Sequence, residues 1–450
     1  MTKRSEKFLI LVSLFFLFLN HFFPSSALAA TKKAYSRAAY NPDKNQFLLV
    51  WADARNHSNP DEADCYKSAG CNNDIYGAIL DQNLYQVGAD FPIAGTPNDE
   101  TYPEVVYNPN NKEYLVVYQC NDGGDQLYNI YATQLNDAGQ VIQDIPISQE
   151  AADQWEPTVV FNHIDNQYLI AYMGHFHEVP DDGAKDIKVQ LLSGGGEKIG
   201  NPHFISVDEN NLRLPGKQER PVIVFIPSNK SYLVVWEDEL KLALGGTILD
   251  ASGNIIISPK TFLIEEGTGW KFYPQVSLNP FNWEIMLVWQ NNKTGVKTVE
   301  AGRFAYSGDR VGNIIMIDSQ AATNTGNPRP AIACDLQNGS CLVAWMDWVN
   351  YQFRLQFFDK SGVRVGNELV FGGDGSRATV VFNEKERYFL VLKTREPFNL
   401  IKINALPAEF SGDLNQDGRV DEIDLTILLK NWGNPWGSTD LQNLLLDWSI

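Results

Sequence analysis

Basic residues are scarce in this sequence. Lys and Arg number 36 against 55 Asp and Glu in 450 residues, which gives a formal net charge of −19. Proteins that hold nucleic acids neutralise phosphates with basic side chains, so we expect no nucleic-acid partner. Hydrophobic residues make up 44% of the chain, and this ordinary fraction excludes disorder throughout its length.

Hydrophobic runs long enough to cross a membrane are also lacking. The apolar run over residues 8–19 is short, follows a basic start and precedes the small residues Ala27 and Ala29. This order is typical of a secretory signal peptide with its cleavage site. We expect residues 1–29 to be removed from an exported protein, secreted or attached to the cell surface, with no transmembrane segment after cleavage. An uncleaved membrane anchor is the alternative.

Signatures of familiar catalytic chemistry are missing as well. No G-x-S-x-G, phosphate-binding loop or C-x-x-C occurs. His175, His177 and Glu178 offer metal ligands in one segment, but they need a further donor, and a solvated loop is the favoured interpretation. Several acidic residues follow strand-like segments, and no two stand out as an acid and base pair. These are Asp122, Asp125, Glu237, Asp238, Glu239 and Asp347.

What the chain does contain is a repeat. Two strand-like segments joined by a polar turn recur seven times, usually ending in Trp or Tyr. The closing residues are Trp51, Tyr118, Tyr172, Trp236, Trp289, Trp345 and Lys393. Their irregular spacing, near 50 residues or somewhat more, matches the blades of a β-propeller better than the tighter periods of solenoids.

Each repeat continues with a third strand and a turn that contains glycine, as at Gly139, Gly196 and Gly253. A brief fourth strand follows, for example over residues 144–148 or 261–264. The seventh repeat shows only three strands, which end near Ala405. The sequence therefore predicts a mainly β fold, a seven-bladed β-propeller of four-stranded blades over residues 30–405. How the ring closes is left open.

The few cysteines fit this register. Residues seven apart face each other across each hairpin, as Tyr40 and Phe47 do, and in the sixth repeat these two positions are Cys334 and Cys341. A disulfide in place of an apolar cross-strand pair is expected in an exported protein. Cys65 and Cys71 lie in one polar loop and are expected to close it, which leaves Cys120 over. The alternative is that all five are reduced.

The segment WADAR over residues 51–55, followed by DIYG over 74–77, resembles repeats of exported bacterial propellers with no assigned activity. The resemblance covers residues 35–405 and implies the fold rather than a chemistry. Connections between second and third strands vary most in length, and long loops on a rigid scaffold often carry binding sites.

One ring of positions is expected near the centre of the propeller, sixteen residues before each closing residue. Its members are Tyr35, Tyr102, Glu156, Arg220, Tyr273, Arg329 and Arg377. Guanidinium groups fit carboxylates and flat rings stack on sugars, so this set suits an acidic sugar. The inventory resembles that of sialidases, although those are six-bladed and their FRIP and S-x-D-x-G-x-T-W motifs are absent. Packing of blade against blade is the competing interpretation.

The C-terminal segment contains a loop with oxygen ligands at the spacing that calcium requires. Its ligands are Asp413, Asn415, Asp417, Arg419 through its backbone carbonyl, Asp421 and Asp424. With the apolar helix-like stretch that follows, the loop resembles a type I dockerin repeat, a small α-helical, EF-hand-like module that binds cohesin domains. The resemblance covers residues 411–450, and the second half repeats the helix without the loop. The module either docks to a cohesin-like protein or caps the propeller surface.

Together these features predict an exported glycan- or surface-binding propeller, docked through a Ca²⁺-dependent module within a polysaccharide-binding or polysaccharide-degrading system. The alternative is a glycoside hydrolase of such an assembly, as the dockerin resemblance implies. A surface protein with a purely structural role is the third hypothesis.

Overall fold

The computed structural model describes residues 33–56, 73–122, 127–150, 152–175, 184–262, 269–293, 295–322, 326–372, 377–394 and 399–406. Within these ranges every regular element is a β-strand, and no helix there is long and apolar enough to cross a membrane. The predicted signal peptide, the Cys65–Cys71 pair, His177, Glu178 and the predicted calcium module lie outside the described residues.

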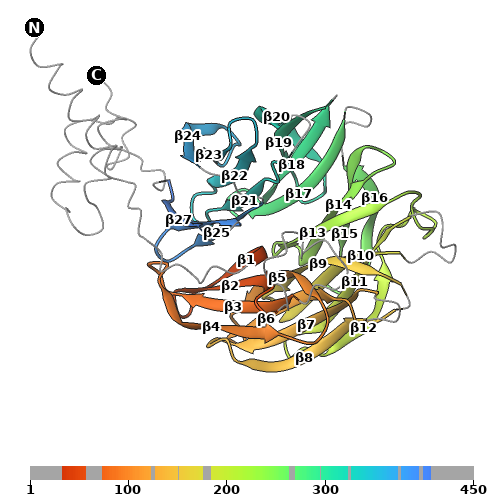
Figure 1. Cartoon of the computed structure of the whole chain (residues 1–450). Coiled ribbons are helices and arrows are strands. Elements are labelled where there is room, and N and C mark those ends of the chain that lie inside the picture. The colour runs from red at the N-terminus through yellow and green to blue at the C-terminus, as the bar shows by residue number, and fades with distance from the viewer. Residues whose placement is uncertain are drawn as a thin grey trace, which may run out of the picture.

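The strands form seven antiparallel sheets in chain order, and each sheet is one blade (Figure 1). Blade 1 contains β1 (Lys33–Asn41), β2 (Gln46–Asp53), β3 (Asp74–Leu80) and β4 (Gln86–Ala94). Blade 2 contains β5 (Glu100–Asn108), β6 (Glu113–Cys120), β7 (Asn129–Asn136) and β8 (Val141–Ser148). Blade 3 contains β9 (Gln154–Asn162), β10 (Gln167–Gly174), β11 (Asp186–Ser193) and β12 (Lys198–Phe204).

Blades 4 to 7 follow the same order. Blade 4 contains β13 (Gln218–Ile226), β14 (Ser231–Asp238), β15 (Ala243–Leu249) and β16 (Ile255–Phe262). Blade 5 contains β17 (Trp270–Asn279), β18 (Glu284–Lys293), β19 (Val296–Phe304) and β20 (Arg310–Ala322). Blade 6 contains β21 (Ala331–Cys334), β22 (Cys341–Asp347), β23 (Gln352–Phe358) and β24 (Arg364–Gly372). Blade 7 contains β25 (Arg377–Asn383), β26 (Tyr388–Thr394) and β27 (Asn399–Asn404).

The predicted seven-bladed propeller is therefore confirmed. Figure 1 shows the first strands of the blades near the middle of the molecule and the fourth strands at its outer edge. The third strand predicted in each repeat is present in every blade, as β7 illustrates. The fourth strands start earlier than predicted, at Val141 in β8 and Ile255 in β16. Because the first half of β8 is exposed, it carries no continuous hydrophobic signal in the sequence.

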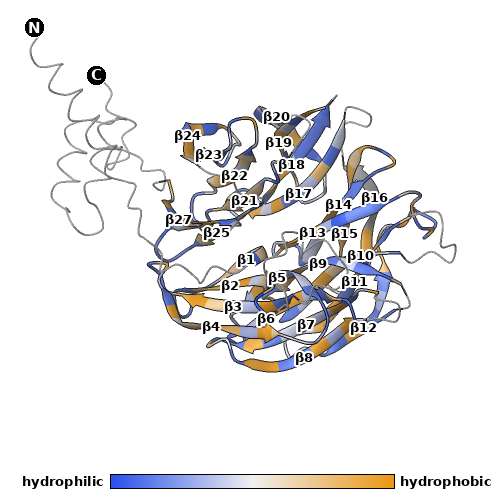
Figure 2. Cartoon of the chain, in the orientation of Figure 1, coloured by the Kyte–Doolittle hydropathy of each residue, from blue (hydrophilic) through white to orange (hydrophobic). Residues whose placement is uncertain are grey.

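The second strand of each blade is buried on both faces. In β2, Leu48 and Val50 pack in a core shared with blade 2, whereas Phe47, Leu49 and Trp51 pack in a core shared with blade 7. Successive side chains of a strand point to opposite faces, so one apolar strand serves two neighbouring cores. Outer strands are mixed, and Figure 2 shows hydrophobic and hydrophilic stretches following each other within β8.

The ring closes by direct packing of blade 7 on blade 1. Among the described residues β1 pairs only with β2, and β27 pairs only with β26, so these two blades share no strand. The Thr379 hydroxyl donates to the Ser36 carbonyl at 3.1 Å, and the Asn383 side chain donates to Asn45 Oδ1 at 2.9 Å. These contacts between blade 7 and blade 1 show how the ring closes, which the sequence alone left open.

The predicted register of the hairpins is also confirmed. Cys334 pairs with Cys341 across β21 and β22, and the two are joined by a disulfide, whereas Cys120 is buried and free. The glycine turns after the third strands have positive φ angles, 83° at Gly139 and 80° at Gly253. Side chains with a Cβ rarely adopt this conformation, which explains the glycine in the repeat.

Candidate functional site at the centre of the ring

The ring residues predicted from the repeat share an unusual backbone conformation. Six of them have positive φ angles between 43° and 54° although none is glycine. These six are Tyr35, Tyr102, Glu156, Arg220, Tyr273 and Arg329. In blades 1 to 5 the pairing of the first and second strands shifts at this point, which marks a β-bulge. The seventh, Arg377, pairs regularly with Thr394.

The preceding blade holds this bulge in place. The Gln119 side chain accepts a hydrogen bond from the backbone N–H of Glu156 at 2.9 Å. At the equivalent position of the next blade, Met173 Sδ lies 3.4 Å from the backbone nitrogen of Arg220. Glu237 repeats the arrangement by accepting from the Tyr273 N–H at 2.6 Å. The residue after the closing aromatic therefore ties its blade to the bulge of the following blade.

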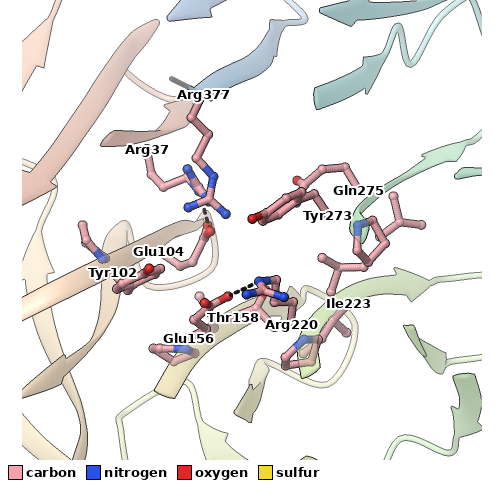
Figure 3. Close-up of a pocket in the computed structure, with 17 residues that line it drawn as sticks. Arg37, Tyr102, Glu104, Glu156, Thr158, Arg220, Ile223, Tyr273, Gln275 and Arg377 are labelled. Atoms are coloured by element: carbon pink, nitrogen blue, oxygen red, sulfur yellow. Dashed lines mark hydrogen bonds and ion pairs between the residues drawn. The ribbon is translucent and has the colours of Figure 1, made fainter. Parts of the chain in front are cut away.

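The ring surrounds a cavity of about 190 Å³ on the inner side of the blades (Figure 3). Of the predicted ring, Tyr102, Glu156, Arg220, Tyr273 and Arg377 line it. A second cavity of about 160 Å³ is lined by Arg329 and shares five residues with the first. The shared residues are Arg37, Glu104, Tyr273, Gln275 and Arg377. We call the two together the axial cavity.

Three of these shared residues, Arg37, Glu104 and Gln275, were not predicted from the sequence. Each lies two positions after a ring residue, just past the β-bulge, which interrupts the alternation of side chains, so the strand period alone did not place them. Tyr35, in contrast, lines neither cavity and stacks on Tyr102 with a ring separation of 3.9 Å.

Arg220 occupies the acidic side of the axial cavity. Its guanidinium lies 2.8 Å from Glu237, 3.3 Å from Glu219 and 3.5 Å from Glu156. Burial alone would lower the pKa of Arg220, but the charges of Glu156 and Glu237 outweigh it and raise the pKa. Burial also raises the pKa of the enclosed Glu237 carboxyl group to about 7. Arg220 is thus neutralised within the protein.

The opposite side of the cavity is basic. Figure 3 shows Arg37 and Arg377 next to each other, with Arg37 bonded to Glu104. No described residue accepts a hydrogen bond from the Arg377 guanidinium or forms an ion pair with it. Burial, together with the charges of Arg37 and Arg329, lowers the pKa of Arg377 to about 10. Arg329 donates to the Tyr273 hydroxyl at 3.4 Å.

Tyr273 lies between the two sides. The guanidinium of Arg220 lies 5.0 Å from the centre of its ring, and that of Arg329 lies 4.7 Å from it. Both separations are within the range of cation–π attraction. The ring therefore holds an arginine from each neighbouring blade.

Most of the other candidates that the structure describes have structural contacts, whereas Asp125 lies outside the described residues. Asp347 forms an ion pair with Arg354 at 2.8 Å, and Asp122 accepts a hydrogen bond from Asn129 at 2.8 Å. The His175 ring packs edge-on against Trp155. In the part of the chain that the structure describes, no cluster of His, Cys, Asp and Glu side chains is suited to a metal ion.

No family model matches the sequence, and no curated protein sequence is similar to it. Among solved structures, the chain is similar to the NanB sialidase from Streptococcus pneumoniae, with a TM-score of 0.43 and 10% identity over 86% of this chain and 70% of that one. It is similar to the intramolecular trans-sialidase from Ruminococcus gnavus, with a TM-score of 0.45 and 8% identity over 86% of this chain and 97% of that one. It is also similar to Chaetomium thermophilum Sqt1, with a TM-score of 0.44 and 12% identity over 82% of this chain and 84% of that one. At such low scores these similarities carry no argument about activity.

Proposed function

We propose that this protein is an exported carbohydrate-binding propeller that takes its ligand at the axial cavity. The observation that carries the proposal is the lining of that cavity, where arginine, glutamate, tyrosine, threonine and glutamine side chains converge from all seven blades. Sugars present many hydroxyl groups and flat apolar faces, and such a lining offers donors, acceptors and aromatic rings for both.

The size of the cavity limits what it takes. Each part is smaller than the roughly 300 Å³ at which pockets for drug-sized ligands begin. A single sugar residue of a longer chain is the fitting occupant, with the rest of the chain outside the mouth. We further propose that the segment 411–450 binds Ca²⁺ through the loop of Asp413 to Asp424 and docks the propeller to a cohesin-like partner within a polysaccharide-binding or polysaccharide-degrading system.

A glycan array probed with the full mature chain tests the proposal. We expect binding to a restricted set of glycans, and we expect Tyr273→Ala to weaken it because Tyr273 lines both parts of the cavity. Arg303→Gln, on the third strand of blade 5 (β19) and outside the cavity, serves as the control. Absence of any glycan binding by wild-type protein would reject the proposed function. If the protein releases reducing sugar from a bound polysaccharide, its function is glycoside hydrolysis rather than binding alone.

A further inference from the structure

The charges around the axial cavity are unevenly distributed. Arg220 faces three carboxylates from blades 3 and 4. Arg37, Arg329 and Arg377 come from the consecutive blades 1, 6 and 7, and Glu104 is the carboxylate that pairs with one of them. We call these three residues the arginine arc. The excess positive charge of the cavity therefore lies on the arc and not at Arg220.

Within the arc, Arg377 is the arginine whose charge is least compensated by the described residues. It is half-buried at the cavity wall, and among the described residues none accepts a hydrogen bond from its guanidinium. Two further guanidinium groups lie close enough to lower its pKa. Enclosing like charges without an acceptor costs free energy, because both desolvation and repulsion oppose it. A bound anion would remove both costs.

We propose that the arginine arc binds the anionic group of the ligand, so that the preferred sugar carries a carboxylate or sulfate. This inference rests on the proposed carbohydrate function and specifies its substrate class. It also changes the set of arginines named from the repeat: Arg37 takes the place of Arg220, whose charge Glu156, Glu219 and Glu237 already satisfy. Guanidinium groups donate paired hydrogen bonds to oxyanions, and the Tyr273 hydroxyl, which accepts from Arg329, has a proton left to donate to the ligand.

The first experiment measures binding to an oligogalacturonate and to the same oligosaccharide after reduction of its carboxyl groups. Wild-type protein should bind the carboxylated form more tightly, and Arg377→Gln should lose on the order of 10- to 100-fold in Kd, as expected for charge-assisted hydrogen bonds. Arg377→Lys should recover part of the loss, because it restores the charge without the planar fork. Arg303→Gln, which replaces a paired arginine outside the cavity, should match wild type.

The second experiment uses sulfate alone and follows the melting temperature of the full chain. Sulfate stabilises proteins in general by exclusion from their surface, so Arg377→Gln measures that background. Specific binding should raise the melting temperature of wild type beyond the background as sulfate increases. Without added anion, Arg377→Gln should be at least as stable as wild type, because it relieves the crowding of like charges.

The outcomes separate the two proposals. Equal affinity for the carboxylated and the reduced oligosaccharide would overturn the anion site and leave carbohydrate binding standing. An equal response of wild type and Arg377→Gln to sulfate would also overturn the anion site. Sulfate stabilisation that needs Arg377, with no glycan bound on the array, would support the anion site and reject the carbohydrate function.

Discussion

Glu100, at the start of β5, keeps a carboxyl group fully buried between blades 1 and 2. Thr96 donates to it from both its backbone and its hydroxyl, and the Cys120 thiol lies 3.3 Å from Oε1. Burial raises the pKa of Glu100 to about 7 and raises the pKa of Cys120 as well. The folded protein therefore retains a proton at a pH where an unfolded glutamate, with a pKa of about 4.3, has lost it.

This difference predicts the direction of a pH effect. Between pH 4.3 and 7, roughly, the unfolded state binds fewer protons than the folded state, so the free energy of unfolding falls as pH rises. We expect the contribution of Glu100 to this fall to be on the order of 3 to 4 kcal/mol. Denaturant unfolding from pH 4.5 to 8 should show a smaller fall for Glu100→Gln than for wild type.

The exposed Glu197→Gln provides the matched control and should keep the wild-type slope. If Glu100→Gln and wild type lose stability in parallel over this range, the buried carboxyl group does not titrate as described.

At the scale of elements, the tie between blades gives a second prediction. Gln119 on β6 satisfies the backbone N–H of Glu156 on β9. Replacing it by leucine leaves that donor without its acceptor, which costs about 1–3 kcal/mol. Gln119→Met should cost less, because Met173 fills the equivalent position of blade 3 with its sulfur near the Arg220 nitrogen. Thermal unfolding of the two variants measures the difference. Equal losses of stability would show that the hydrogen bond from the Glu156 N–H does not contribute as described.

The strands illustrate what sequence alone predicts and where it stops. Alternation of side chains gave the hairpin pairs, including Cys334 with Cys341, because both partners lie within a few residues of each other. The positive φ at Tyr102 or Arg220 was not predictable in this way. Left-handed backbone is usually attributed to glycine, and the residue before proline is expected to be extended.

The candidate site was predictable only in part. The ring positions followed from the repeat, but Arg37 and Glu104 come just after the β-bulge, which breaks the strand period, so alternation alone did not place them beside the cavity. Glu237 carried no local signal either, because its partners Arg220 and Tyr273 lie on the first strands of two different blades. The balance of charge around each arginine depends on contacts between blades, and these follow from the closed ring rather than from local pattern.

At the scale of the whole molecule, we predict that calcium affects the C-terminal module and not the propeller. Chelation should increase proteolysis near Ser411 while the β-sheet circular dichroism signal persists. The blades have their own hydrophobic cores, and none of their described residues forms a cluster suited to a metal ion. In the proposed calcium loop, Asp413 to Asp424, carboxylates gathered around one ion would repel one another without the cation.

Asp424→Ala should reproduce the effect of chelation, whereas Asp309→Ala, on an exposed turn of blade 5, should not. A protease pattern in Asp424→Ala that still changes with calcium as in wild type would show that this loop is not the site.

The last described residue, Leu406, lies at the end of blade 7 that is opposite Arg377. Arg377 lies at one end of β25, and Arg387 lies in the turn at its other end, where the Leu406 carbonyl accepts hydrogen bonds from Arg387 and Asn338. A seven-residue strand separates the two ends, a distance of roughly 20 Å. A partner that binds the chain beyond Leu406 would therefore act at the opposite end of blade 7 from Arg377. Anchoring and ligand binding at Arg377 then need not compete for the same surface.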